Sequence, residues 1–163
     1  MRSNNPTGIR NLCAVAMHLR QTMPANAATN YAVRTVLREA INKSNPQYQG
    51  NVNRKNCRHL SVAAERRLAE DPKAPLVADH AVPVSITLKA FAGASDPTLD
   101  SVVNLVAKYA VMVLVTPQED ACLRAAGLVK SMPANWDEKD PFARYKHVGI
   151  EIKANAAFRG SQE

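Results

Sequence analysis

The stretch AVMVLVTPQED, residues 110–120, predicts a buried strand that runs directly into a helix. Its first six residues are all apolar, which is the length and character of a strand covered on both faces. Thr116 can cap a helix, Pro117 suits the first helical position, and Glu119 stands three residues after Thr116, which makes a capping box. We expect this helix to end at Gly127, because glycine is common just beyond a helix C-terminus.

Apolar residues three and four positions apart predict further helices on either side of this stretch. Thr29 or Asn30 is the expected N-cap of the first clear one, and Asp96 followed by Pro97 is a typical helix start. GIRNLCAVAMHLRQTM, residues 8–23, is a further helix candidate. The predicted helices span residues 30–41, 60–70 and 85–93, a segment that starts at Asp96-Pro97, and a short segment near 141–146.

These patterns predict one α+β domain over residues 1–163, mostly helical, with a small antiparallel β element. The two strands of that element are expected near residues 75–84 and 110–115. The ends of the chain, residues 1–28 and 154–163, are expected to be loosely ordered. No internal repeat and no linker suggests a second domain.

The composition is that of a globular protein with a hydrophobic core. Of 163 residues, 46% are hydrophobic and 21% are charged, and no apolar run approaches the roughly 20 residues that span a bilayer. The run LCAVAM, residues 12–17, is too short for the core of a signal peptide. Cys13, Cys57 and Cys122 lie far apart without metal-ligand spacing, so we expect free thiols and a cytoplasmic protein.

The positive charge is concentrated in the first part of the chain. Residues 1–67 hold 11 Lys and Arg against two Glu, a balance of +9, whereas residues 68–163 hold 10 against 12 acids. A basic half of this kind is suited to electrostatic attachment to nucleic acid, and a solvated basic surface without a partner is the alternative. The predicted nucleic-acid contacts are Arg54, Lys55, Arg58, His59, Arg66 and Arg67.

The stretch VADHAVPV, residues 77–84, places Asp79 and His80 inside a short apolar run that Pro83 ends. An imidazole can activate water as a general base, and a carboxylate can hold a divalent ion. The second strand and its capped helix could bring metal ligands toward His80. Alternatively, Asp79 and His80 form a structural pair at a strand end, with the imidazole bonded to backbone.

ADHAVPV resembles the D-H-x-x-P strand of HNH, or His-Me finger, endonucleases, and VMVLVTPQED resembles that family's second strand and metal-binding helix. The resemblance covers about residues 75–127. It implies that His80 is the general base, Asp79 is a metal ligand, and Asp120 or Glu119 is the second ligand. It further implies Mg²⁺ or Mn²⁺ as cofactor, DNA phosphodiesters as substrate, and a phage, plasmid or bacterial defence setting.

Simpler explanations exist for the two helix residues. Glu119 is accounted for by the capping box, and Asp120 by the favourable interaction of an acid with a helix N-terminus. The function hypotheses are therefore an HNH-like metal-dependent endonuclease and a non-catalytic nucleic-acid-binding or assembly protein that uses its basic N-terminal half.

Overall fold

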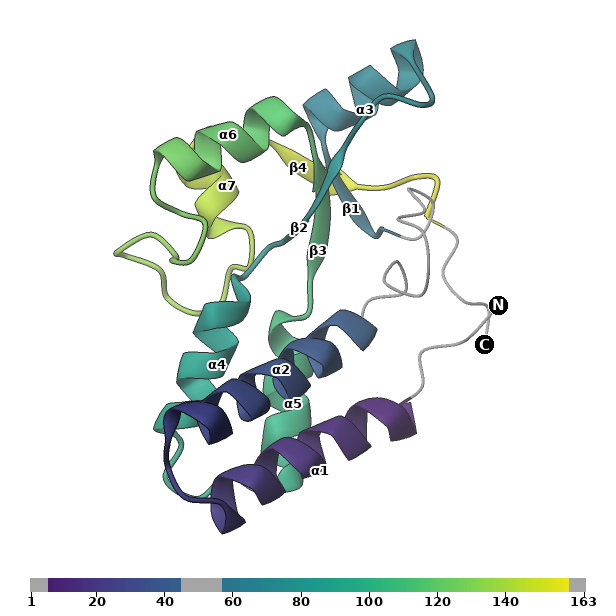
Figure 1. The fold of residues 1–163 in the computed structure, drawn as a ribbon. Helices are drawn as coiled ribbons and strands as arrows, with labels where there is room; N and C mark the ends of the chain where they lie inside the picture. Colours follow the sequence, from purple (N-terminus) through teal and green to yellow (C-terminus); the bar gives the residue numbers. More distant parts are fainter. Residues whose placement is uncertain (1–5, 45–56, 159–163) are drawn as a thin grey trace.

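The computed structural model describes residues 6–44 and 57–158 (Figure 1). It has a helical part, made of α1, α2, α4 and α5, and a sheet part, made of the four strands with α3, α6 and α7 (Figure 1). The helices are α1 (Pro6–Thr22), α2 (Ala27–Lys43), α3 (Val62–Glu70), α4 (Val84–Gly93), α5 (Leu99–Tyr109), α6 (Pro117–Ala125) and α7 (Ala143–His147). The strands are β1 (His59–Ser61), β2 (Val77–His80), β3 (Met112–Val115) and β4 (Ile152–Ala154).

The sheet has the strand order β2-β3-β1-β4. β2 and β3 pair antiparallel, as the sequence predicts, whereas β1 pairs with β3 parallel and β4 pairs with β1 antiparallel. The α+β class and the helical majority are confirmed, but the sheet is mixed and has two strands that the sequence did not indicate. A strand of three residues, such as β1 or β4, is too short to show an alternating pattern.

The helix predicted over residues 60–70 begins two residues later than expected. Leu60 and Ser61 belong to β1, and Ser61 is also the N-cap of α3, because its side chain accepts a hydrogen bond from the backbone N–H of Ala64. Leu60 is buried beside Leu114 of β3. The prediction was wrong here because LSVAAERRLAE has helical spacing throughout, and only pairing with β3 holds its first residues extended.

Two predicted helix starts were also displaced. Asn26, rather than Thr29 or Asn30, caps α2, and its side chain accepts the N–H of Thr29 at 2.9 Å. Thr98 caps α5 and accepts the N–H of Ser101 at 3.2 Å. In each case another residue of capping type, in extended backbone, supplied the oxygen that the first turn requires.

The start of α6 confirms the capping box. Thr116 Oγ1 accepts the N–H of Glu119 at 3.2 Å, and Glu119 Oε2 accepts the N–H of Thr116 at 2.8 Å. The helix ends two residues before Gly127, whose φ of +72° is a backbone conformation that glycine adopts without steric cost.

β3 is buried on both faces, which explains its continuous apolar run. Val113 and Val115 pack with Leu123 and Tyr145 on the face that α6 and α7 cover. The residues of the opposite face pack in a second cluster: Cys57, Leu60, Ala64, Met112 and Leu114. The core of the helical part is separate and comprises Cys13, Ala16, Leu37, Ala40, Ile41, Phe91, Val102 and Val106.

The chain crosses between the two parts twice within the described residues, from β2 to α4 and from α5 to β3. The backbone N–H of Ala81 in the first crossing donates to the carbonyl of Val111 in the second at 2.8 Å. The expectation for residues 1–28 and 154–163 falls partly outside the described residues; within them, α1 occupies Pro6–Thr22 and β4 ends at Ala154. No helix in the described ranges is sufficiently long and apolar to cross a membrane.

Candidate functional site

The carboxylate of Asp79 is held by two side chains from α7. Asp79 Oδ2 accepts a hydrogen bond from the Tyr145 hydroxyl at 2.6 Å and another from Arg144 Nη2. The side chain of Asp79 is 19% exposed and that of Arg144 only 2% exposed. The carboxylate that the sequence suggested as a metal ligand is therefore part of a largely buried ion pair.

The guanidinium of Arg144 also binds three backbone carbonyls. Nε donates to Ala81 at 3.0 Å, Nη1 donates to Leu128 at 2.9 Å, and Nη2 donates to His80. Burial opposes the charged form, but the hydrogen bond to Asp79 and the negative charge of that carboxylate outweigh it and raise the pKa of Arg144. Arg144 stays charged and ties α7 to the end of β2 and to the segment after α6.

Tyr145 contributes a neutral donor to this cluster. Burial and the adjacent carboxylate of Asp79 raise the pKa of Tyr145 well above its ordinary value. The hydroxyl thus keeps its proton at neutral pH and donates a hydrogen bond to Asp79.

Asp79 and His80 lie on opposite faces of the sheet. Neighbouring residues of a strand point in opposite directions, and Asp79 pairs with Val113 whereas His80 pairs with Met112. Val113 belongs to the apolar cluster on the α7 face, and Met112 belongs to the cluster on the other face. Burial lowers the pKa of His80, an effect that the Asp79 charge opposes and the Arg144 charge reinforces, so the imidazole is neutral at pH 7.

Glu119 joins the starts of two helices. Besides closing its own capping box, Glu119 Oε2 accepts a hydrogen bond from Ser61 Oγ, the N-cap of α3, at 2.6 Å. Because β1 and β3 are parallel, both strands end at the same edge of the sheet, and each continues into a helix there. One carboxylate therefore stabilises two helix N-termini, and the capping role accounts for Glu119.

Asp120 forms an ion pair with Arg124 one turn further along α6. The strand register separates this helix start from His80, since His80 lies opposite Met112, four residues before Thr116. At the usual rise this separation is about 13 Å along the strand. The structure does not bring Asp120 or Glu119 to His80. No group of three or more His, Cys, Asp or Glu in the described part of the chain is placed to hold a metal ion.

The predicted nucleic-acid contacts have different surroundings. Arg54 and Lys55 lie outside the described residues. Arg66 on α3 is exposed, and the neighbouring Arg67 is half-buried and donates to Gln118 Oε1 at 3.0 Å. The guanidinium of Arg58 is exposed and lies over the ring of Phe158, 5.4 Å from its centroid.

His59 has the surroundings of a packing residue. Its ring meets Phe142 edge-on with 5.0 Å between centroids, and burial, with the nearby charge of Arg58, lowers its pKa. Nδ1 is buried without a hydrogen bond to any described residue. A neutral ring of this kind offers little attraction to a phosphate.

Sequence reasoning missed Arg144 and Tyr145 as the residues that hold Asp79. Sixty-five residues separate Arg144 from Asp79 along the chain. The motif ARY in residues 143–145 gives no local sign that an arginine is buried. A buried arginine becomes recognisable only when its acidic partner is known.

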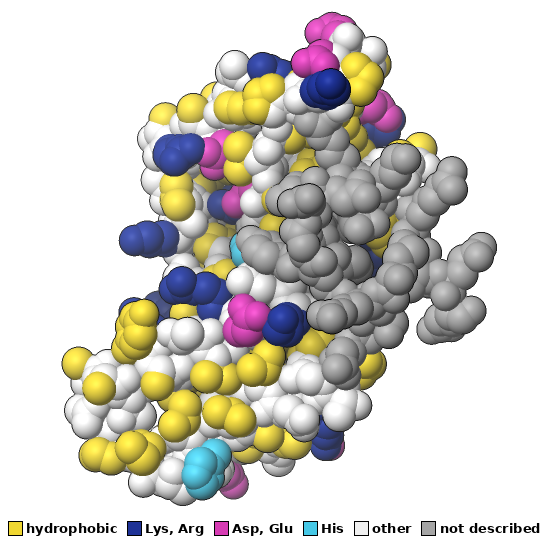
Figure 2. All heavy atoms as spheres, turned by 45° about the vertical axis from the view of Figure 1, so that its right-hand side comes forward, with side chains coloured by type: hydrophobic (Ala, Val, Ile, Leu, Met, Phe, Trp, Pro, Cys, Tyr) yellow, Lys and Arg dark blue, Asp and Glu magenta, His cyan; other side chains and the backbone are white. Residues whose placement is uncertain are grey.

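The space-filling view shows a hollow between the sheet part above and the helical part below (Figure 2). Lys and Arg side chains stand at its borders (Figure 2). The sequence did not suggest this arrangement, because the two parts alternate along the chain.

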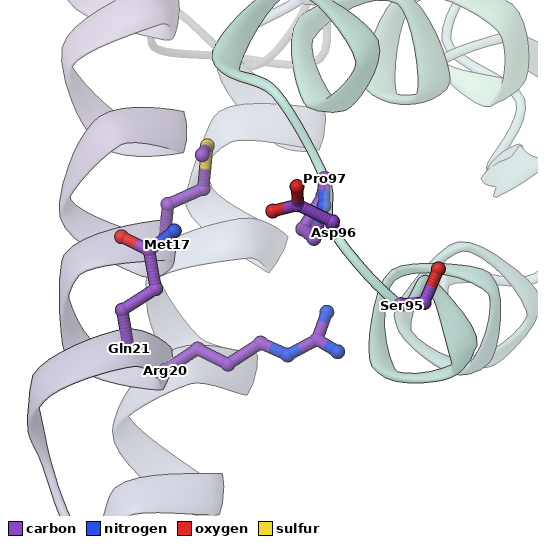
Figure 3. A pocket seen from close by; sticks show the side chains of 6 residues that line it. All are labelled: Met17, Arg20, Gln21, Ser95, Asp96 and Pro97. Carbon is purple, nitrogen blue, oxygen red and sulfur yellow. The ribbon is translucent and has the colours of Figure 1, made fainter.

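A pocket of about 220 Å³ lies in the helical part, between α1 and the α4–α5 connection (Figure 3). Met17, Arg20 and Gln21 line it from α1, and Ser95, Asp96 and Pro97 line it from the α4–α5 connection. The guanidinium of Arg20 donates to three carbonyls at the end of α4, those of Phe91, Ala92 and Ala94. Its donors thus serve as a C-terminal cap for α4, so the pocket is a packing feature.

Comparison of the chain with protein-family models, curated proteins and solved structures gives no match.

The first testable consequence concerns Arg144. We expect Arg144→Met to reduce the free energy of unfolding by about 3–5 kcal/mol, because Asp79 would keep a largely buried charge without its cation. Urea unfolding measures the loss. Arg124→Met, which breaks the exposed ion pair with Asp120, is the matched control and should cost less than about 1 kcal/mol. Equal losses in the two variants would contradict this role of Arg144.

A second consequence is a pH dependence that originates at His80. The folded state lowers the pKa of His80 below the ordinary 6.5, so the unfolded chain takes up the proton first as pH falls. Stability should therefore be lost from about pH 6.5 downward, by at most about 1.4 kcal/mol per pH unit, until the folded pKa is reached. His80→Gln should lack this component. Urea unfolding at pH 7.5 and 5.5 compares the two proteins, and identical pH dependences would refute it.

Proposed function

We propose that the protein binds nucleic acid, with DNA as the partner, through the basic N-terminal half of its chain. One observation carries this proposal: Arg34, Arg38, Arg58 and Arg66 are all exposed and form no ion pair with any described residue. Exposed guanidinium groups without an acidic partner are suited to phosphate oxygens, which they can bind with two parallel hydrogen bonds.

The acids of this half do not neutralise the four arginines. Residues 1–67 contain only two acids, Glu39 and Glu65, and each already pairs with a lysine. Glu39 lies 3.1 Å from Lys43, and Glu65 lies 2.8 Å from Lys153. The positive potential of this half therefore remains available to a polyanion.

Binding should depend on salt and on these four arginines. Fluorescence anisotropy with labelled DNA at several salt concentrations measures the slope of log K against log salt. Replacing Arg34, Arg38, Arg58 and Arg66 together by alanine should reduce the magnitude of that slope by up to about 0.9 for each phosphate that is no longer bound.

A variant with the same change of net charge provides the control. Lys73, Lys89, Lys130 and Lys139 are four exposed lysines of the other half, and none is ion-paired to a described residue. Their joint replacement by alanine should leave most of the affinity intact. If both variants lose affinity equally, binding follows overall charge; if wild type does not bind DNA, the proposal fails.

A second proposed function is HNH-like hydrolysis of DNA with His80 as the general base. It is supported by the lowered pKa of His80, which keeps the imidazole in its basic form at pH 7. The acids proposed as ligands for Mg²⁺ or Mn²⁺ are not grouped into a metal site. Asp79 is bound by Arg144 and Tyr145. Asp120 pairs with Arg124 in α6, and Glu119 caps that helix. The support for this second function is therefore the neutral imidazole of His80 at the end of β2 together with the resemblance of ADHAVPV to the D-H-x-x-P strand.

A plasmid-nicking assay with Mg²⁺ or Mn²⁺ tests the hydrolysis proposal. Wild type should nick the plasmid, EDTA should abolish nicking, and His80→Ala should reduce the rate about 100-fold or more while DNA binding persists. His147→Ala, which removes an exposed imidazole from the end of α7, is the control. An intact plasmid at high protein concentration would eliminate the hydrolysis proposal and leave the binding proposal standing.

We also propose a cytoplasmic location, where a DNA-binding protein and reduced thiols are compatible. Cys13, Cys57 and Cys122 form no disulfide with a described residue.

A further inference from the structure

The outer face of α2 carries an aromatic ring and two arginines in one row. Tyr31, Arg34 and Arg38 lie three and four residues apart, so their side chains project from the same side of the helix. All three residues are exposed. α2 also buries Leu37, Ala40 and Ile41 in the core of the helical part.

The helices that pack against α2 leave the three residues of the row exposed. α2 packs mainly against α1, with further contacts to α4 and α5 (Figure 1). A ligand could therefore reach the row without displacing any described element.

Tyr31 is the most exposed large apolar side chain of the described ranges. Its exposed fraction is 74%, against 47–50% for Val15, Met23 and Val129. The other tyrosines in the described ranges, Tyr109 and Tyr145, are buried. An exposed aromatic ring beside guanidinium groups is the combination on which unpaired bases stack while their phosphates bind arginine.

The charges in the row are available to a ligand. Arg34 and Arg38 form no ion pair with a described residue, and the nearest acid along the helix, Glu39, pairs with Lys43. One helical turn separates the two arginines, which is about 6 Å along the axis. Two long side chains at that separation can contact neighbouring phosphates of one strand.

We propose that the outer face of α2 binds single-stranded DNA, with an unpaired base stacked on Tyr31 and adjacent phosphates on Arg34 and Arg38. Charge complementarity between the two arginines and the phosphates selects this partner. The exposed ring favours a single strand over a duplex, because bases in a duplex are already stacked on one another. This inference rests on the proposed DNA binding and specifies its surface and the form of DNA.

The test uses the full chain with fluorescein-labelled (dT)₁₅ and a strand of the same length that has the sugar-phosphate backbone without bases. Tyr31→Leu should weaken (dT)₁₅ binding roughly 5- to 100-fold, since this is the usual effect of removing one stacking ring. Tyr31→Phe keeps the ring and should stay within about twofold of wild type. Binding of the strand without bases should not respond to either change of Tyr31.

The arginines have a different expected signature. Arg34→Ala and Arg38→Ala should each reduce the magnitude of the salt slope by about 0.7, the value per phosphate on single strands, with both DNA strands. Lys89→Ala, an exposed lysine of α4 without an ion pair to a described residue, is the control and should leave the slope unchanged.

The outcomes separate this inference from the proposed function. If wild type binds neither strand nor a duplex, DNA binding itself is excluded. If wild type binds (dT)₁₅ but the variants of Tyr31, Arg34 and Arg38 bind equally well, the surface lies elsewhere and only this inference is overturned. Preference for a duplex, with no effect of Tyr31→Leu, overturns it as well. Thermal unfolding by circular dichroism confirms that the variants remain folded.

Discussion

The buried guanidinium of Arg144 is the interaction on which the sheet part depends. It joins α7 to the carboxylate of Asp79 and to carbonyls of His80, Ala81 and Leu128. A charge removed from water is costly unless it is paired and its donors are hydrogen-bonded, and both conditions are met here. Arg144 consequently anchors three segments: the last residues of β2, the first crossing to the helical part and the segment after α6.

This anchor changes how the Asp79-His80 pair is understood. An acid and an imidazole next to each other in the sequence suggest a shared site, but a strand directs them to opposite faces. The Asp79 carboxylate binds Arg144, and His80 lies on the opposite face of the sheet, with Met112. His80 is a neutral imidazole at the end of β2.

The other predicted acids also have structural roles that the fold explains. A parallel pair of strands, β1 and β3, ends at one edge of the sheet, and both continue into helices whose first N–H groups need acceptors. Glu119 connects the two caps, Ser61 and Thr116. The exposed arginines of the N-terminal half, by contrast, form no ion pair with a described acid, and the proposal of phosphate binding rests on them.

Local signals were sufficient for the elements whose ends are set by neighbouring residues. The apolar run 110–115 and the Thr116–Glu119 capping box predicted β3 and the start of α6, because the strand is covered on both faces and the cap closes within four residues. The helical pattern of residues 30–41 similarly predicted the body of α2. The sequence also showed the uneven distribution of charge, because counting charged residues along the chain requires no structure.

Tertiary structure alone decided what depends on residues far apart in the chain. β1 and β4 are three residues long and form because they pair across the sheet. Segments this short have no periodic pattern from which the sequence could predict a strand. The partners of Asp79 lie 65 and 66 residues away, and only the folded chain brings them together. The sequence by itself determined the helices, the central strand and the positive charge of the N-terminal half. Folding decided which acids form ion pairs or caps and which arginines stay exposed, because those outcomes follow from burial and long-range pairing.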